Sequence, residues 1–290
     1  QVLKPAAAPQ SYSEVFVSNQ SVVGNRSLRV GVDAEGLMRS VQAVFKKRGH
    51  VQHGMNPELW TLFCIICRFA RQPGVFIFIF DGPEKAHTKR GKHVLSQPLW
   101  LVQHLTSMIE KFGYYHRTAT GEAEVELCHL QQLGAIDLIF TEDSDVWAYG
   151  ATQVVRRLTS KSIPQDLAVY SSDHIQQHLG LTTAGFILFA LVNGGDYDVG
   201  LPGVGPRIAY GLAHTRLGDE LLEIVNAGQA HFEARIPVWR AALIDELATN
   251  RSGFLKNCER AVAAKVPLDF PSLEIVQRYT SPASSVIDGQ

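Results

Sequence analysis

The stretch Val75 to Phe80, VFIFIF, constrains the fold most, because it is apolar at every position. Such a strand must be covered on both faces, as in a parallel sheet with helices on each side. Leu28 to Val32 and Ile136 to Phe140 are two further short apolar runs, and Gln153 to Val155 is a weaker candidate. Helical patterns alternate with these runs, which predicts an α/β fold with a mostly parallel, twisted sheet flanked by helices. The expected helices are Pro57 to Arg71, Gln97 to Phe112, and Glu122 to Leu133, the last ended by Gly134.

The strand pattern stops near Ser171, and short helices separated by Gly and Pro follow. We therefore predict an α/β core at residues 1–170, a helical region at 171–280 and a small polar tail at 281–290. The expected helices of the second region are Ser172 to Leu179, Thr183 to Val192, Arg207 to Leu212, Leu217 to Asn226 and Val238 to Asn250.

Composition excludes several classes of protein. A chain of 290 residues with 46% hydrophobic and 19% charged residues can bury a core, so it is not a disordered chain. Its net charge of −1 gives no uniform basic field, so a nucleic-acid partner would have to meet local basic patches. Four cysteines are too few for a disulfide framework, which favours a reducing compartment, and Cys64 and Cys67 are expected as buried thiols. No apolar stretch reaches the ~20 residues of a membrane span, and no secretory signal opens the chain.

Acidic residues follow the three clearest predicted strands at similar positions. Asp33 and Asp81 come directly after the first two apolar runs, and Asp143 and Asp145 come shortly after the third. The carboxyl ends of parallel strands meet at one edge of a sheet, so we expect these side chains to converge there. Further acids in the set are Glu122 and Glu124 at the start of a predicted helix, and Asp196 after a Gly-Gly turn.

So many carboxylates repel one another unless cations lie between them. Oxygen ligands without His or Cys favour Mg²⁺ or Mn²⁺ over zinc, and two such ions about 3.5–4 Å apart can hydrolyse a phosphodiester. The alternative is that each acid only caps a helix or stabilises a turn. Spacing alone leaves both interpretations open.

The motifs around the acids add a resemblance. The order of these motifs is similar to that of the XPG/flap-endonuclease family, over residues 29–212. The motifs are Gly31-Val32-Asp33-Ala34, Phe80-Asp81-Gly82-Pro83, Gly121-Glu122-Ala123-Glu124-Val125-Glu126, Thr141-Glu142-Asp143-Ser144-Asp145, Gly195-Asp196-Tyr197 and Gly200-Leu201-Pro202-Gly203-Val204-Gly205-Pro206.

The resemblance implies a PIN-like core and a metal-dependent, structure-selective DNA endonuclease in the nucleus. It also implies two Mg²⁺ ions, replaceable by Mn²⁺, and a catalytic, metal-ligating set of acids. That set is Asp33, Asp81, Glu122, Glu124, Asp143, Asp145 and Asp196.

Two features narrow the choice within the family. The segment between Asp81 and Glu122 is shorter than the segment that forms the helical arch in true flap endonucleases. The sequence around Asp196 is similar to that of the Holliday-junction resolvase branch of fungi and animals. The segment Phe270 to Glu274, with Tyr279, resembles the part that precedes a chromodomain in that branch.

Basic residues near the acids are candidates for DNA contacts. Lys85, Lys89, Arg90 and Lys92 form the densest cluster, and Lys89 and Arg90 are expected to hold the scissile phosphate during catalysis. A solvated basic loop is the alternative. Lys46 to Arg48, and Arg156, Arg157 and Lys161, are weaker candidates.

A second DNA-binding element is expected in the helical region. Gly203 and Gly205 leave backbone N–H groups open to a phosphate, and Arg207 lies in the helix that follows. The segment Leu201 to Ala209 thus resembles a helix-hairpin-helix, which the family uses with a monovalent cation, K⁺, to grip duplex DNA.

The sequence also departs from the family. The usual Met-Gly start is missing, and Glu35 replaces a small polar residue. The chain therefore looks like a fragment that starts late and ends before any chromodomain. The main hypothesis is an enzyme that cuts Holliday junctions, as a monomer that dimerises on the junction. The alternatives are a 5′ flap endonuclease or 5′ exonuclease of the same family, a catalytically weak DNA-binding module, and a PIN-like ribonuclease.

Overall fold

The computed structural model describes residues 3–24, 26–48, 56–85, 88–89, 92–93, 99–157 and 166–282. One sheet has seven strands, and two short strands form a separate hairpin. The sheet contains β1 (Ala8–Ser11), β2 (Leu28–Asp33), β3 (Gly74–Phe80), β6 (Tyr115–Thr118), β7 (Leu138–Phe140), β8 (Gln153–Arg157) and β9 (Asp166–Ser171), and the hairpin contains β4 (Thr88–Lys89) and β5 (Lys92–His93).

The sheet has the order β1-β9-β8-β7-β2-β3-β6. The five strands from β8 to β6 are parallel, whereas β9 is antiparallel to β8 and β1 is antiparallel to β9. The mostly parallel sheet predicted from the sequence is therefore confirmed. The outer strands β1 and β6 were not predicted, because they are short and carry mainly polar or half-exposed side chains.

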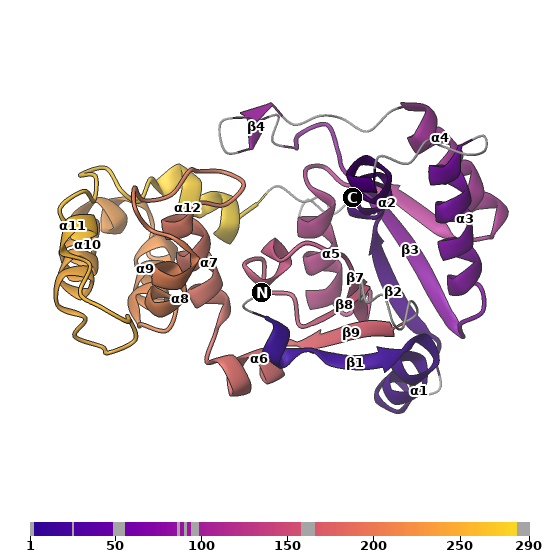
Figure 1. The fold of residues 1–290 in the computed structure, drawn as a ribbon, viewed down its shortest axis with the longest axis horizontal. Coiled ribbons are helices and arrows are strands. Elements are labelled where there is room, and N and C mark those ends of the chain that lie inside the picture. Colours follow the sequence, from indigo (N-terminus) through magenta and orange to yellow (C-terminus); the bar gives the residue numbers. More distant parts are fainter. Residues whose placement is uncertain are drawn as a thin grey trace.

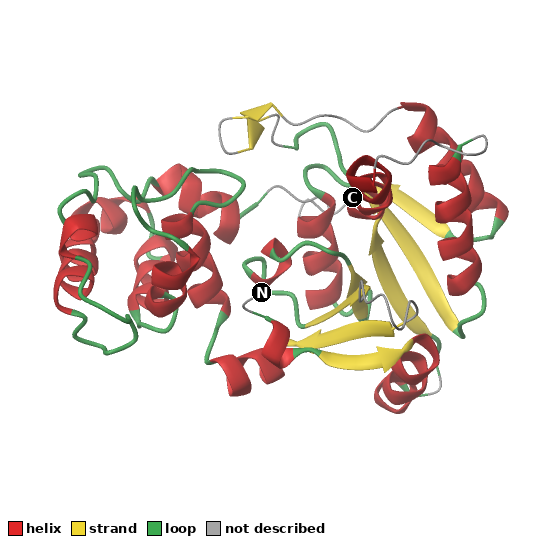
Figure 2. Cartoon of the chain, in the orientation of Figure 1, coloured by secondary structure: helices red, strands yellow, loops and turns green. Residues whose placement is uncertain are grey.

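Helices cover both faces of the sheet, and a helical half follows it (Figures 1 and 2). A 3₁₀ turn, η1 (Lys4–Ala6), precedes β1, and a second one, η2 (Asp145–Trp147), follows β7. The helices are α1 (Tyr12–Val23), α2 (Ala34–Arg48), α3 (Pro57–Phe69), α4 (Leu99–Lys111), α5 (Ala123–Gln132), α6 (Ser172–Leu179), α7 (Thr183–Asn193), α8 (Pro206–Leu212), α9 (Leu217–Asn226), α10 (Gln229–Thr249), α11 (Arg260–Ala263) and α12 (Leu273–Thr280).

Strand β3 shows why its sequence is apolar throughout. Phe76 and Phe78 point into a core formed with α1 to α4, while Ile79 points into a second core formed with α5. The ring of Phe76 stacks on that of Phe69 at 4.6 Å between centroids. In the neighbouring strand, a Cβ on Gly31 would lie 2.4 Å from the Leu127 side chain, so the sheet and α5 approach closely there.

The second core continues from the sheet into the helical half. It joins Leu3, Ile79 and α5 to buried residues of α7, α9 and α10, and ends with Val276 and Tyr279 on α12. The strands end at Ser171, as expected, and the proposed division near residue 170 stays a prediction. Within the described residues, no single helix is long and apolar enough to cross a membrane, although the bent pair α6 and α7 passes that test together.

Most predicted helices are confirmed, and α10 is the main correction in the helical half. It begins at Gln229 and not near Val238, although Pro237 lies inside it. Proline has no backbone N–H donor and often interrupts a helix, so the sequence predicts a helix that begins only after Pro237. Phe232 and Ile236, before the proline, are buried together with Trp239 after it, and this packing holds one continuous helix. The helices α1, α2, α11 and α12 were not predicted.

Candidate active site

The acid-bearing strands end at one edge of the sheet. Strands β2, β3 and β7 are parallel neighbours, so their carboxyl ends coincide. Asp33 ends β2 and Asp81 follows β3, while Asp143 lies beyond β7. Glu122 is the N-cap of α5, and Glu124 lies in the first turn of that helix. We call the seven predicted acids at this edge and beside it the acid rim.

Asp33 is the most deeply buried strand acid of the rim, with 1% of its surface exposed. The backbone N–H of Gly36 donates to its Oδ1 at 2.7 Å, and the Thr141 hydroxyl donates to its Oδ2 at 2.9 Å. Burial raises the pKa of Asp33 to about 6, and the nearby Asp81 carboxylate adds to that rise. Asp33 thus caps the start of α2 and still carries a costly negative charge at neutral pH.

Asp81 ties β3 to the start of α5. Its Oδ1 accepts the backbone N–H of Ala123 at 3.0 Å. Its Oδ2 faces two cations: Lys85 Nζ at 3.5 Å and Arg39 Nη2 at 3.8 Å. The Asp81 side chain is only 8% exposed. The Asp81 carboxylate therefore caps the start of α5 and is also one of the acids predicted for the rim.

Asp143 and Asp145 are fixed by a short relay of hydrogen bonds. The N–H of Asp143 donates to Thr141 Oγ1 at 3.1 Å, and the N–H of Asp145 donates to Asp143 Oδ1 at 3.0 Å. Thr141 also binds Asp33, so it links the carboxylates that follow β2 and β7. The guanidinium of Arg156 donates to the carbonyl oxygen of Asp143.

A pocket of about 360 Å³ opens along this part of the rim and is lined by Asp33, Arg39, Glu124 and Asp143, among others. Arg39 comes from α2, and 41% of its side chain is exposed. Burial alone would lower the pKa of Arg39, but the surrounding carboxylates, Asp33 and Glu124 foremost, raise it. Arg39 is therefore the firmly charged cation of this pocket.

The other acids of the rim face a group of three tyrosines. The Tyr197 hydroxyl donates to Glu122 Oε2 at 3.2 Å and lies 2.6 Å from the Tyr149 hydroxyl. Burial raises the pKa of Tyr279 far above its ordinary value, and the charges of Asp145, Tyr197, Asp196 and Glu122 add to this rise. Asp145, Asp196 and Glu122 therefore act electrostatically on one side chain, although they come from three separate segments.

The structure describes only some of the residues that are predicted to contact DNA. Lys85 pairs with Asp81, so it lies at the rim. Lys89 and Lys92 lie opposite each other in the β4–β5 hairpin, and only their backbone belongs to the described structure. Arg90 lies outside the described residues, as do the side chains of Lys46 to Arg48 and the whole of Lys161.

The weaker candidates Arg156 and Arg157 have partners within the protein. Arg156 lies over the Tyr170 ring at 5.6 Å, and Arg157 pairs with Glu142 at 3.3 Å. These two arginines therefore hold the β8 edge of the rim. That placement explains their clustering without a DNA partner.

The glycine-rich segment lies between α7 and α8, as a helix-hairpin-helix requires. Gly203 has a φ of +89°, a left-handed conformation that suits glycine, and Gly205 is the N-cap of α8. Arg207 is exposed. Since α8 has only seven residues, a phosphate contact here would depend on the hairpin backbone and Arg207 rather than on a helix dipole.

The donors of the rim are chemically suited to a hard divalent ion, because all are carboxylate oxygens. Burial foremost, and the Asp81 carboxylate after it, raise the pKa of Asp33, and a bound cation would favour its ionised form. Within the described ranges, however, no three acidic, imidazole or thiol side chains gather tightly enough to ligate one ion. The carboxylates are instead held by protein donors, so metal binding requires side-chain adjustment at an open pocket.

Sequence reasoning missed several residues at this site. Arg39 lay in a helix that was not predicted, and the chain gave no local signal for it. Glu35 was noted only as a departure, yet burial and Asp81 raise its pKa to about 7. The contacts of Tyr149 and Tyr279 join segments far apart in the sequence, so only the fold reveals them.

Known proteins share parts of this sequence and its fold. The XPG I-region family matches residues 114–196, which include four acids of the rim at Glu122, Glu124, Asp143 and Asp145, and Asp196 at its end. This match and the relatives below support the XPG/flap-endonuclease family for the chain. Its PIN-like α/β fold is thereby confirmed as well.

A curated relative and two solved structures give the extent of the similarity. The human protein named Flap endonuclease GEN homolog 1 is 27% identical over 216 residues, which cover 68% of this chain and 24% of that protein. A crystal structure of the Holliday junction-resolving enzyme GEN1 with product DNA and Mg²⁺ aligns with a TM-score of 0.75 and 29% identity, over 97% of this chain and 63% of that one. A GEN-1 structure binding potassium aligns with a TM-score of 0.77 and 29% identity, over the same shares of each chain. The chain therefore spans only about a quarter of the length of the human relative.

Proposed function

We propose that this chain is the catalytic core of a Mg²⁺-dependent endonuclease that cuts branched double-stranded DNA by phosphodiester hydrolysis. The observation that carries the proposal is that acids from β2, β3, α5 and the segment after β7 meet at one open edge of the sheet. A GEN1 structure that resembles this chain holds product DNA and Mg²⁺, which supports the same chemistry here.

In this proposal the acid rim holds two Mg²⁺ ions, which Mn²⁺ can replace. When bound, two such ions activate a water and stabilise the leaving oxygen. The protein orients the carboxylates: Gly36 and Thr141 fix Asp33, the start of α5 fixes Asp81, and Thr141 fixes the turn that carries Asp143. The ligands in this proposal are Asp33, Asp81, Glu122, Glu124, Asp143, Asp145 and Asp196.

Cations beside the rim would hold the scissile phosphate. Arg39 lines the pocket together with Asp33 and Glu124, and Lys85 pairs with Asp81. We propose that both neutralise phosphate charge, together with Lys89 and Arg90 of the hairpin segment. With a divalent ion bound by the carboxylates, the Arg39 guanidinium would be available to contact the substrate.

We propose a second DNA-binding element at the hairpin between α7 and α8. Gly203 and Gly205 keep the backbone accessible, and exposed Arg207 adds a positive charge. K⁺ is the proposed ion at this element, supported by the related GEN-1 structure with potassium. Lys92 is proposed as a further contact with the DNA backbone.

Two substrates follow from the names of the similar proteins. One is a Holliday junction, as for the resolving enzyme GEN1, and the other is a DNA flap, as in the name of the human relative. We favour the junction and propose that the chain is a monomer alone, dimerises on the junction and works in the nucleus. Light scattering would then give one molar mass for the free chain and a complex with two chains on one junction.

Cleavage of end-labelled junction, 5′ flap and linear duplex in Mg²⁺ tests the function, with Glu122→Gln as the matched inactive variant. Paired nicks across the junction that disappear in the variant would support the resolvase function. Cutting of the flap alone would identify a flap endonuclease. Binding of both substrates without any cutting would refute the catalytic proposal.

A further inference from the structure

Helix α12 brings a distant part of the chain to the acid rim. Its Tyr279 is buried, with 3% of its surface exposed. The Tyr279 ring stacks on that of Tyr149 at 5.9 Å and meets that of Tyr197 edge-on at 5.1 Å between centroids. These three tyrosines, the tyrosine cluster, come from the segment after β7, the loop after α7, and α12.

The hydrogen bonds of the cluster have a direction. Tyr197 donates its single proton to Glu122 Oε2, so the 2.6 Å contact with Tyr149 requires Tyr149 to be the donor. Burial foremost raises the pKa of Tyr149 as well as that of Tyr279, so both hydroxyls keep their protons. The relay therefore runs from Tyr149 through Tyr197 to Glu122.

The loop that carries Tyr197 is pressed against α12. A Cβ on Gly195 would lie 2.3 Å from the hydroxyl oxygen of Tyr279, so only a glycine permits this approach. Gly195 directly precedes Asp196, an acid of the rim. Tyr279 thus fixes the backbone from which both Asp196 and Tyr197 project.

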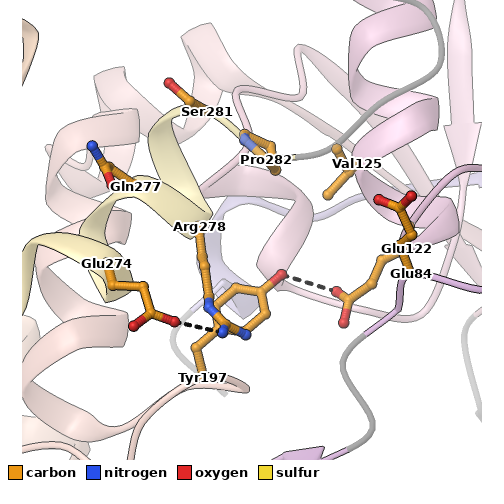
Figure 3. A pocket seen from close by; sticks show the side chains of 10 residues that line it. Glu84, Glu122, Val125, Tyr197, Glu274, Gln277, Arg278, Ser281 and Pro282 are labelled. Carbon is orange, nitrogen blue, oxygen red and sulfur yellow. Dashed lines mark hydrogen bonds and ion pairs between the residues drawn. The ribbon is translucent and has the colours of Figure 1, made fainter.

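The open side of Tyr197 is covered by Arg278 (Figure 3). The Arg278 guanidinium lies 5.5 Å from the centre of the Tyr197 ring and pairs with Glu274 at 2.8 Å. Together with Glu122 and Glu84, these residues line a pocket of about 350 Å³ between α12 and the start of α5. Tyr197 is therefore held by two neighbouring residues of α12: Arg278 lies over its ring and Tyr279 contacts it edge-on.

We propose that Tyr197 is a positioning residue: it fixes the carboxylate of Glu122 before metal arrives, and α12 holds Tyr197 in place. The inference rests on the proposed nuclease function. A carboxylate that is already oriented loses less conformational freedom when it ligates an ion. Removing such an outer partner typically costs about 10- to 100-fold in metal affinity or activity.

Tyr197→Phe tests the proposal, because it removes one hydroxyl and keeps the ring contacts with Arg278 and Tyr279. The matched control is Tyr12→Phe, which alters a buried tyrosine in the other core, against Phe69. Mn²⁺ affinity of the free chain is measured by titration calorimetry, and single-turnover cleavage is measured over a Mg²⁺ series. We expect Tyr197→Phe to weaken Mn²⁺ binding about 10-fold or more, and high Mg²⁺ to restore cleavage.

A double-mutant cycle separates positioning from a general structural effect. If Tyr197 acts through Glu122, then Tyr197→Phe changes Mn²⁺ affinity little when Glu122→Gln is already present. Equal losses in both backgrounds, or parental Mn²⁺ binding by Tyr197→Phe alone, would overturn the inference. A parental chain that neither binds Mn²⁺ nor cuts DNA would instead defeat the proposed function.

Discussion

Replacing Asp33 by Asn should stabilise the metal-free protein at neutral pH. The pKa of Asp33 rises from 3.8 to about 6 in the folded protein, first because of burial and then because of Asp81. Each pH unit of this difference corresponds to about 1.4 kcal/mol, so ionising Asp33 costs the fold about 3 kcal/mol at most. Asn carries no charge, and its side chain can still accept the Gly36 N–H and donate to Thr141 Oγ1.

The sign follows from which state ionises first. Below about pH 4 the Asp33 carboxyl is protonated in both states and costs nothing. As the pH rises from about 4 to 6, the unfolded chain loses its proton first, so the parent protein loses stability until the folded group has also ionised. The advantage of Asp33→Asn should therefore grow over this range. Asp33 also adds to the rise in the pKa of Glu35, so its replacement should give a further, smaller gain as Glu35 ionises near pH 7.

Urea unfolding in EDTA at a series of pH values measures this difference. We expect Asp33→Asn to match the parent near pH 4 and to exceed its free energy of unfolding by about 1–3 kcal/mol at pH 7.5. Added Mg²⁺ should raise the stability of the parent and leave the variant unchanged. A variant less stable than the parent at pH 7.5, or an advantage that does not vary with pH, would refute the reasoning.

Three further predictions concern other parts of the molecule. Arg39→Gln should slow cleavage about 10-fold or more in single-turnover assays, whereas Arg71→Gln, at the opposite end of β3, should leave the rate unchanged. Gly31→Ala should lower the free energy of unfolding by about 1–3 kcal/mol in urea, because its Cβ would lie 2.4 Å from the Leu127 side chain; a neutral effect would mean that α5 can move away. Arg207→Ala should weaken binding to every duplex alike and reduce the slope of log affinity against log salt by about 1, and an unchanged slope would exclude Arg207 from the DNA contact.

The parts of the site that the sequence predicted are those with a local cause. Asp81 directly follows an unbroken apolar strand, and parallel strands place such residues at one edge, so no long-range information was needed. Arg39 was not predicted because its helix has a mixed surface and follows a strand without a clear turn. Its position beside Asp81 depends on how α2 packs against the sheet.

The tyrosine cluster shows the limit more strongly. The sequence identifies Gly195, Asp196 and Tyr197 as a motif. Nothing in the local sequence indicates that Tyr279 packs against this segment. The edge strand β6 was missed for a different reason. Tyr115 and its neighbours are largely exposed, so the strand lacks the apolar alternation by which strands are recognised.

The core shared by the sheet and the helical half has a consequence for biosynthesis. Leu3 and Tyr279 belong to one hydrophobic core, so the first and last described parts of the chain must meet before that core is complete. Contacts so distant in sequence form slowly and depend on the whole chain. During translation, this core stays incomplete until α12 has left the ribosome, and the nascent chain would need protection from aggregation for that period.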